Sequence, residues 1–229
     1  EGTTICATGG QNALTVIAFA KKGCFLNAPD VYMEKIAIGG NLPSDLVSLD
    51  EKPIVNLKNL AKAKKKDIRE LVVCILNRER HYELIKNCRD AGARIMLISD
   101  GDVSGVIATS EEESGVDIYM GTGGSPEGVL AAAALRCIGG QMQTRMTFRN
   151  EEEISRARKV GVKNLDKIYN LNELAAGDVM FAATGVTDGN MLRGVKNKER
   201  LAYTESIVMR SSTQTVRKIK AKHSIKNKL

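Results

Sequence analysis

The central part of the chain alternates between short apolar runs and amphipathic segments. Apolar residues dominate the runs 71–76, 94–99 and 116–120, which have the length and character of buried strands. Between these runs, apolar residues recur at helical spacing over 80–93 and 102–110. Such an alternation predicts a β-α-β-α-β unit, in which right-handed crossovers bring the three strands into one parallel sheet.

The flanking segments predict a second set of elements. Residues 13–20 form an expected strand, and residues 24–26 are expected to return beside it as a hairpin after a Lys-Lys-Gly turn. A helix is expected to run from Ser125, its predicted cap, to the Gly139-Gly140 pair that ends it. The other expected elements are strands over 31–38 and 178–183, helices over 56–64 and 151–160, and a terminal hairpin of 202–209 with 213–220.

A polar or glycine-rich cluster follows each of the three central strands. Residues 77–80 (Asn-Arg-Glu-Arg) follow the first strand, residues 100–102 (Asp-Gly-Asp) the second, and residues 121–128 (Gly-Thr-Gly-Gly-Ser-Pro-Glu-Gly) the third. The carboxyl ends of parallel strands share one edge of a sheet, where α/β proteins bind ligands. The sequence therefore predicts that the three clusters meet in one phosphate-handling site.

The third cluster combines features that suit an anion and a metal ion. Glycines let a backbone approach a ligand closely, and the N–H groups at a helix start favour negative charge. Glu127 lies in the first turn of the predicted helix, where its carboxylate could hold a divalent cation beside a phosphate. The alternative is a plain capped helix in which Glu127 interacts only with the helix dipole.

Each of the first two clusters can be interpreted in two ways, as a ligand-binding site or as a purely structural feature. Asp100 and Asp102 could bind metal or accept hydrogen bonds from sugar hydroxyls, or they could form a turn with Asp102 as a helix cap. Arg78 and Arg80 could bind a phosphate through their planar guanidinium groups, or they could be surface charges. His81 could contact an anion, although a position on the helix surface is favoured.

Charge and composition narrow the class of partner. The net charge of +7 is compatible with nucleic acid or with a small anionic substrate. Aromatic residues make up 4% and Trp is absent, which disfavours nucleic-acid binding. Apolar runs all stay well below the about 18 residues of a membrane span, so no membrane partner is expected. The five cysteines include no C-x-x-C pair, and a reducing, cytoplasmic location fits them best.

Several short blocks of this sequence resemble the class II fructose-1,6-bisphosphatases, in order and over essentially the whole chain. The blocks are 1–3, 23–30 with 32–35, 80–81, 100–102, 123–128, 183–185 and 204–205. The resemblance implies the lithium-sensitive phosphatase superfamily and an α/β fold, a layered α-β-α-β-α sandwich. It also implies hydrolysis of the 1-phosphate of fructose 1,6-bisphosphate in gluconeogenesis, with Mn²⁺ (or Mg²⁺) as cofactor, in a homo-oligomer.

The resemblance assigns roles to twelve residues. Glu1 and Thr3 are the implied catalytic residues, Thr3 orienting the attacking water, and Glu1 and Glu127 are the implied metal ligands. The implied substrate-binding residues are Glu1, Gly2, Thr3, Tyr32, Arg78, Glu79, Arg80, Asp100, Gly101, Asp102 and Gly124. Relatives often carry Lys-Pro-Arg where this chain has Arg78-Glu79-Arg80, so Glu79 brings a negative charge close to a phosphate.

Relatives also carry a substantial segment before the Glu-Gly-Thr block, with an Asp and a Glu that complete the metal site. We therefore expect residues 1–40 to be the remnant of a first metal-binding α+β domain. Residues 41–185 are then an α/β substrate-binding domain, and residues 186–229 a β-hairpin region that packs on the sheet. On this basis the 229-residue chain alone is expected to have little or no activity.

Three alternatives stay open at this point. Sedoheptulose 1,7-bisphosphate or an inositol phosphate could be the preferred substrate of the same phosphatase chemistry. The chain could instead bind a sugar phosphate without hydrolysing it. Nucleic-acid binding through the basic tail that begins at Arg217 is the third alternative, and it would be strongly salt-dependent.

Overall fold

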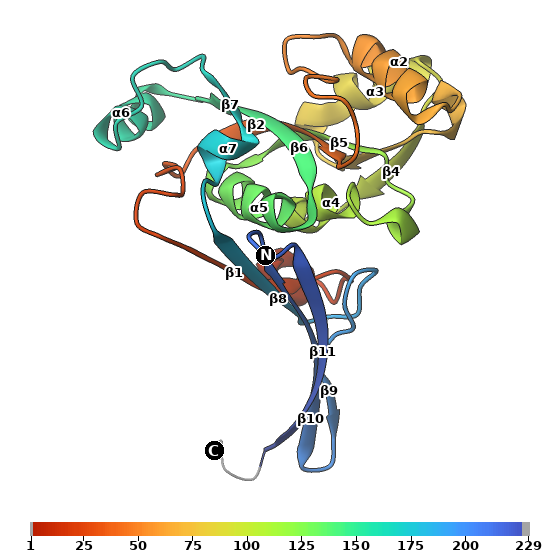
Figure 1. Ribbon diagram of the computed structural model, residues 1–229, viewed down its shortest axis with the longest axis vertical. Helices are drawn as coiled ribbons and strands as arrows, with labels where there is room; N and C mark the ends of the chain where they lie inside the picture. Colours follow the sequence, from red (N-terminus) through yellow and green to blue (C-terminus); the bar gives the residue numbers. More distant parts are fainter. Residues whose placement is uncertain (1, 226–229) are drawn as a thin grey trace.

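A computed structural model describes residues 2–225, in which two β-sheets are stacked with helices between and above them (Figure 1). The six-stranded sheet has the order β4-β3-β5-β2-β6-β7. Its strands are β2 (Tyr32–Gly39), β3 (Val72–Leu76), β4 (Arg94–Ile98), β5 (Ile118–Gly124), β6 (Gly140–Thr147) and β7 (Ile168–Asn170). Strand β3 is parallel to β4 and β5, which confirms the predicted β-α-β-α-β unit.

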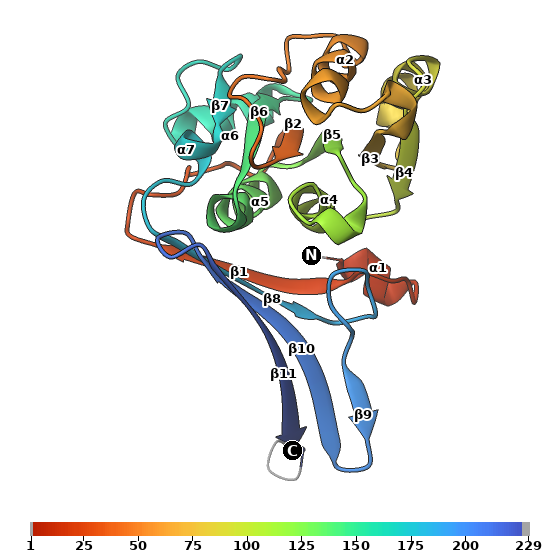
Figure 2. The ribbon, with the colours of Figure 1, turned by 45° about the vertical axis from the view of Figure 1, so that its right-hand side comes forward.

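Helices cover both faces of this sheet, as Figure 2 shows. The outer helices are α2 (Pro53–Lys64) and α3 (Tyr82–Asp90), and the helices between the two sheets are α4 (Asp102–Ala108) and α5 (Ser125–Ile138). The remaining helices are α1 (Thr3–Ala7), α6 (Glu151–Lys159), α7 (Leu171–Leu174) and the 3₁₀ turns η1 (Ile68–Glu70), η2 (Glu79–His81) and η3 (Glu112–Ser114). The α/β architecture is therefore a stack of helix, sheet, helix and sheet layers.

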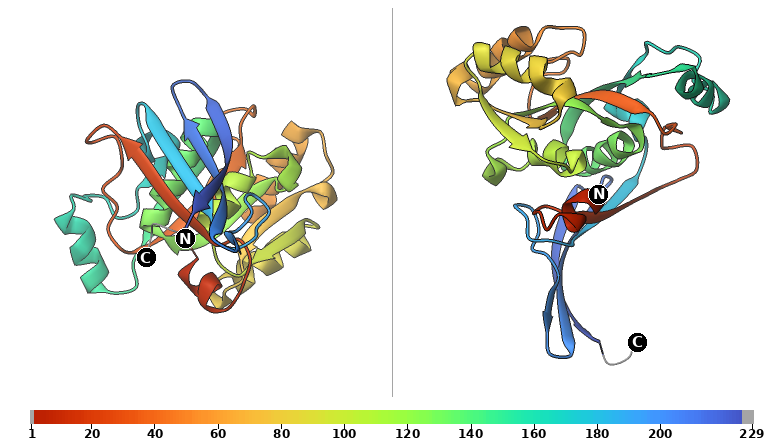
Figure 3. Two further views of the ribbon diagram at one scale, coloured as in Figure 1. Left: turned by 90° about the horizontal axis from the view of Figure 1, so that it is seen from below. Right: turned by 180° about the vertical axis from the view of Figure 1, so that it is seen from behind.

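The second sheet is antiparallel and has the order β1-β8-β10-β11, with β9 paired to β10. Its strands are β1 (Leu14–Ala20), β8 (Val179–Gly185), β9 (Lys196–Lys198), β10 (Leu201–Arg210) and β11 (Thr215–Ser224). The far part of the β10–β11 hairpin projects away from the rest of the molecule (Figure 3). Lys218, Lys220 and Lys222 stand at alternate positions along β11, the outermost strand.

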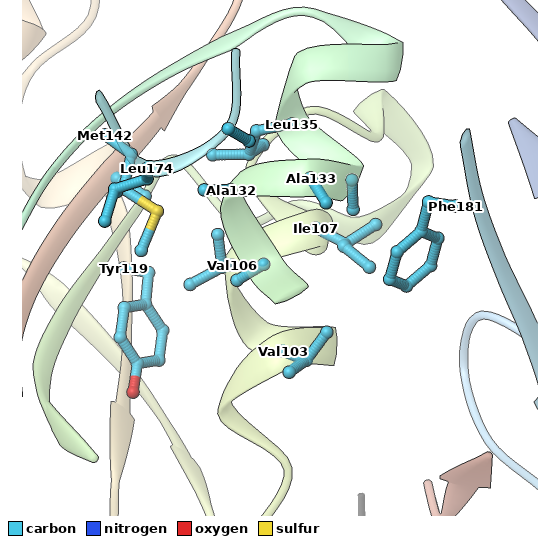
Figure 4. Close-up of a cluster of buried hydrophobic side chains, with 14 of the residues drawn as sticks. Val103, Val106, Ile107, Tyr119, Ala132, Ala133, Leu135, Met142, Leu174 and Phe181 are labelled. Carbon is cyan, nitrogen blue, oxygen red and sulfur yellow. The ribbon is translucent and has the colours of Figure 1, made fainter. Parts of the chain in front are cut away.

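The core between the sheets is built from small and branched side chains (Figure 4). Ala132 and Ala133 of α5 are fully buried and let the helix lie close to its neighbours. Ile107 of α4 and Phe181 of β8 belong to the same cluster, and Phe181 is 0% exposed. Phe181 therefore joins the second sheet to the helical layer beneath the first.

Two local predictions are wrong. Residues 24–26 do not return beside β1 as a hairpin: β1 is an edge strand of the second sheet, and its neighbour there is β8. Phe25 instead forms a single bridge with Ala175, and the Ala176 N–H donates to the Cys24 carbonyl at 2.7 Å. A distant strand thus supplies the hydrogen bonds that a local hairpin would have supplied.

Ser125 is not the cap of α5. Strand β5 continues to Gly124, which is the N-cap, and Ser125 is already the first helical residue. Its buried hydroxyl donates a hydrogen bond to the Pro29 carbonyl. Pro126 lies in the first turn, and the predicted helix end at Gly139 is confirmed, with a φ of 84° at that residue.

The sheets do not follow the predicted domain boundaries at 40 and 185. Strand β2 lies inside the six-stranded sheet, and β8 lies in the second sheet between β1 and β10. The functional division of the chain into three domains stays a prediction. Within residues 2–225, no helix has the length and apolarity that crossing a membrane requires.

Candidate active site

A cavity of about 340 Å³ opens where β3, β4 and β5 end, and it collects residues from five parts of the chain. It is lined by Gly2, Thr3, Thr4, Tyr32, Leu76, Arg78, Arg80, Asp100, Asp102, Gly123, Gly124 and Glu127. The three polar clusters predicted to converge therefore do lie around one space. The N-terminal segment, which holds Thr3 at the start of α1, completes the wall.

Most, but not all, of the predicted site residues reach this cavity. Glu79 and Gly101 are outside its lining, and Glu1 lies outside the residues that the structure describes. Gly101 takes a left-handed conformation, with a φ of 87°, at the start of α4. Its place in the Asp-Gly-Asp cluster is therefore explained by a backbone turn that favours glycine. The roles assigned to the lining residues stay predictions.

Arg80 is held in a fixed direction by the backbone of β5. Its Nε and Nη2 atoms donate to the Thr122 carbonyl at 3.0 and 2.8 Å. The guanidinium carbon also lies 4.9 Å from the centre of the Tyr32 ring. A guanidinium has five N–H groups, so this arrangement leaves further donors for a ligand. Arg80 is thus preorganised to bind an anion in the cavity.

Arg78 and Asp100 face each other across the ends of β3 and β4. An Arg78 Nη2 atom lies 3.8 Å from an oxygen of Asp100. The same guanidinium donates to the Asn77 carbonyl at 3.2 Å. Both side chains are about one-third exposed, so the pair is weak enough to rearrange around a ligand.

The Tyr32 ring lies close to two guanidinium groups, those of Arg80 and Arg149. Sequence patterns do not predict the contact with Arg149. The guanidinium of Arg149, from the loop before α6, lies 4.6 Å from the centre of the Tyr32 ring. Arg149 in turn donates to the buried carboxylate of Glu153 at 2.7 Å through Nε. Arg149 was missed because its nearest chain neighbours carry no recognisable motif.

His81 is neither on the surface nor free to contact an anion, so both interpretations of it were wrong. The side chain is buried, and its Nδ1 atom donates to the Leu76 carbonyl at 2.8 Å. Its Nε2 atom accepts a hydrogen bond of 2.8 Å from the Thr122 N–H. Together, His81 and Arg80 bind both backbone groups of Thr122, and they fix the strand that leads into the glycine-rich cluster.

We expect replacement of His81 by glutamine to flatten the dependence of stability on pH. Burial lowers the pKa of His81 below its ordinary value of 6.5, and the positive charges of Arg80 and Arg78 lower it further. The unfolded chain therefore takes up a proton before the folded protein does, so this contribution to stability is complete above pH 6.5 and is lost as pH falls below it. Urea unfolding at about pH 7.5 and about pH 5.5 measures the difference.

The chain offers a matched control for that measurement. His223 is the second of the two histidines, and it lies on the β10–β11 hairpin, 3.0 Å from the Thr204 hydroxyl. His223→Gln serves as the control for the loss of an imidazole outside the cavity. A His81→Gln variant with an unchanged slope would show that His81 does not resist protonation.

Asp102 is held from behind by a lysine that was not among the predicted site residues. The side chain of Lys35 is 0% exposed and forms an ion pair with the Asp102 carboxylate. Its ammonium group also donates to the Gly124 carbonyl at 2.8 Å. Lys35 lies in β2, between Met33 and Ala37, on the face packed against α5.

Glu127 is the cavity carboxylate best placed to serve as a metal ligand. Within residues 2–225, Asp102 and Asp100 each face a cation, whereas no cation lies within ion-pair distance of Glu127. A Cβ built on Gly124 would lie 2.0 Å from a Glu127 oxygen, so the side chain folds back over that glycine. The same residues contain no group of three or more His, Cys, Asp or Glu side chains able to hold a metal.

Over most of its length the chain is similar in sequence to members of one protein family. The chain matches the family described as bacterial fructose-1,6-bisphosphatase, glpX-encoded, over residues 1–223. It is 39% identical to the D-fructose 1,6-bisphosphatase class 2/sedoheptulose 1,7-bisphosphatase of Synechococcus sp. (strain JA-2-3B'a(2-13)), over 97% of this chain and 68% of that protein. It is 38% identical to the fructose-1,6-bisphosphatase class 2 of Haemophilus influenzae, over 97% of this chain and 71% of that protein. The chain therefore belongs to the class 2 fructose-1,6-bisphosphatase family of hydrolases.

Proposed function

We propose that this protein hydrolyses the 1-phosphate of fructose 1,6-bisphosphate to give fructose 6-phosphate, as a step of gluconeogenesis. The proposal rests on which residues line the cavity at the ends of β3, β4 and β5. Two arginines, two aspartates, a threonine hydroxyl and a glutamate line it together. This set matches a doubly phosphorylated sugar, because guanidinium groups bind phosphate and carboxylates accept from hydroxyls.

Each part of the cavity has a chemical task in this proposal. Arg78 and Arg80 bind the distal 6-phosphate, and Asp100 and Asp102 accept hydrogen bonds from the sugar hydroxyls. Gly2 and Gly124 allow the backbone to approach the substrate. The Thr3 hydroxyl orients the water that attacks the 1-phosphate in line with the leaving oxygen.

Glu127 is the described residue that would hold Mn²⁺, or Mg²⁺, beside the 1-phosphate. Its carboxylate oxygens suit either ion, and Glu1 is the second ligand that the family resemblance implies. Such an ion supplies positive charge at the phosphoryl oxygens and lowers the pKa of a bound water. The helix start at α5 adds a positive backbone field on the same side of the cavity.

The direct test is phosphate release from fructose 1,6-bisphosphate in the presence of Mn²⁺. We expect the natural gene product to release one phosphate per sugar and to lose this activity when EDTA removes the metal. A natural gene product that releases no phosphate with either Mn²⁺ or Mg²⁺ would contradict the proposal.

Sedoheptulose 1,7-bisphosphate is the second candidate substrate. The cyanobacterial relative is named for activity on both bisphosphates, and it matches 97% of this chain. The two sugars share the phosphate groups that Arg78 and Arg80 would bind and differ in length by one carbon. Comparing kcat/KM for the two bisphosphates, with an inositol monophosphate as a third substrate, separates the alternatives.

In the natural gene product, Arg80→Ala is expected to raise KM for fructose 1,6-bisphosphate about tenfold or more and to leave kcat within a few-fold. A charged hydrogen bond to phosphate contributes about 1.5–3 kcal/mol, and the 6-phosphate is bound in the ground state as well as in the transition state. Steady-state kinetics measure the change. Arg89→Ala, in the last turn of α3, is the control with wild-type KM. An unchanged KM for Arg80→Ala would remove Arg80 from the phosphate site.

A further inference from the structure

Lys35 is a charged side chain in the interior of the protein. It lies in the middle of the six-stranded sheet, with its side chain 0% exposed, and that of Asp102 is 7% exposed. An ammonium group away from water costs several kcal/mol unless its partners compensate. A buried lysine next to a ligand cavity therefore needs a reason beyond the packing of apolar residues.

The ammonium group of Lys35 ties together two walls of the cavity. It pairs with Asp102, the first residue of α4, and it donates to the carbonyl of Gly124, the last residue of β5. Asp102 and Gly124 both line the cavity, whereas Lys35 does not reach it. Lys35 can therefore act on a ligand only through the groups that it holds.

Two glycines of the glycine-rich cluster make room for this ion pair. A Cβ built on Gly123 would lie 2.2 Å from an oxygen of Asp102 and 3.1 Å from the Lys35 ammonium. A Cβ on Gly128 would lie 3.2 Å from Cε of Lys35 and 2.7 Å from the sulfur of Met33. At Gly123 and Gly128 the space beside the backbone is therefore filled by side chains of the protein. The sequence alone had indicated that a ligand would approach the backbone of this cluster.

We propose that Lys35 is a positioning residue that orients the Asp102 carboxylate for a hydroxyl group of the sugar. With one oxygen held by Lys35, Asp102 keeps its other oxygen as an acceptor toward the cavity. A carboxylate locked in this way favours a polyhydroxylated phosphate ester over a phosphate ester without hydroxyls. The inference rests on the proposed function, because it assigns the hydroxyl-binding part of the same site.

The test is a double-mutant cycle on KM for fructose 1,6-bisphosphate, measured on the natural gene product. Lys35→Met and Asp102→Asn are each expected to raise KM about tenfold, with a smaller change in kcat. The double variant is expected to have the KM of Asp102→Asn alone, because the proposed effect of Lys35 on the sugar runs through that carboxylate and not through the Gly124 carbonyl that it also holds. If the two increases in KM multiply, or if Lys35→Met has the KM of the wild type, the assignment is wrong.

A second variant disturbs the pair without removing a charge. Gly123→Ala forces the Asp102 carboxylate to move, and it is expected to raise KM about tenfold even where Lys35→Met fails to fold. Gly40→Ala is the matched control, since its nearest atoms would lie at an ordinary 3.4 Å or more. A Gly123→Ala enzyme with wild-type KM would overturn the assignment.

These outcomes separate the inference from the proposed function. If the wild-type protein hydrolyses fructose 1,6-bisphosphate and the Lys35 and Gly123 variants keep its KM, the positioning role alone is wrong. If the wild-type protein does not hydrolyse the bisphosphate, both the proposed function and the role of Lys35 are contradicted.

Discussion

Replacing Glu127 by glutamine in the natural gene product is expected to reduce turnover of fructose 1,6-bisphosphate by more than about 100-fold. Loss of even an outer partner of a metal ligand costs about 10–100-fold, and Glu127 is proposed to be a ligand itself. Glutamine keeps the size of the side chain and its place in the first turn of α5, so folding is retained. The measurements are phosphate release with saturating Mn²⁺ and direct binding of Mn²⁺ by electron paramagnetic resonance.

The matched control for this substitution is Glu151→Gln. Glu151 occupies the same kind of position, in the first turn of α6, but it is exposed and outside the cavity. Its replacement is expected to leave both turnover and Mn²⁺ binding unchanged. A Glu127→Gln protein that binds Mn²⁺ and turns over substrate like the wild type would exclude Glu127 as a ligand.

Replacing Phe181 by alanine is expected to lower the free energy of unfolding by about 3–5 kcal/mol. Phe181 is 0% exposed and packs in the core between the second sheet and the helical layer (Figure 4). The substitution removes a whole ring from that contact and leaves a cavity that the two rigid layers cannot close. Equilibrium unfolding in urea, followed by circular dichroism, measures the loss.

Phe19→Ala provides the comparison on the neighbouring strand. Phe19 lies on β1, next to β8, but its side chain faces away from the core and is 55% exposed. Its replacement is expected to change the free energy of unfolding by less than about 1 kcal/mol, because little surface leaves contact with the protein. Equal losses for the two phenylalanines would mean that the sheet does not pack as the structure shows.

The parts of the fold that could be predicted are those with a local signal. Runs of apolar residues marked β3, β4 and β5, and the polar residues at their ends came together as expected. The reason is geometric, since parallel strands joined by right-handed crossovers leave few possible arrangements of the strands.

The homo-oligomeric state and the cytoplasmic location stay predictions.

The features that were missed depend on contacts between distant segments. Lys35 reads, with its neighbour Glu34, as one of two charged residues in a largely apolar strand, and its partner Asp102 is 67 positions away. His81 reads as a surface residue, although its Nε2 atom binds the backbone of Thr122. The β1 strand likewise looked like half of a hairpin because the sequence of β8 lies far downstream. Local patterns do not contain such pairings.

The lysines of β11 have a consequence for how the molecules behave together at high concentration. An outermost strand presents unpaired backbone groups on which another chain can add as a further strand, and charged side chains, lysine in particular, oppose this. Lys218, Lys220 and Lys222 repeat at alternate positions along this strand, and all three are exposed. Their mutual repulsion between copies is expected to keep this arm from seeding aggregates, more strongly at low ionic strength.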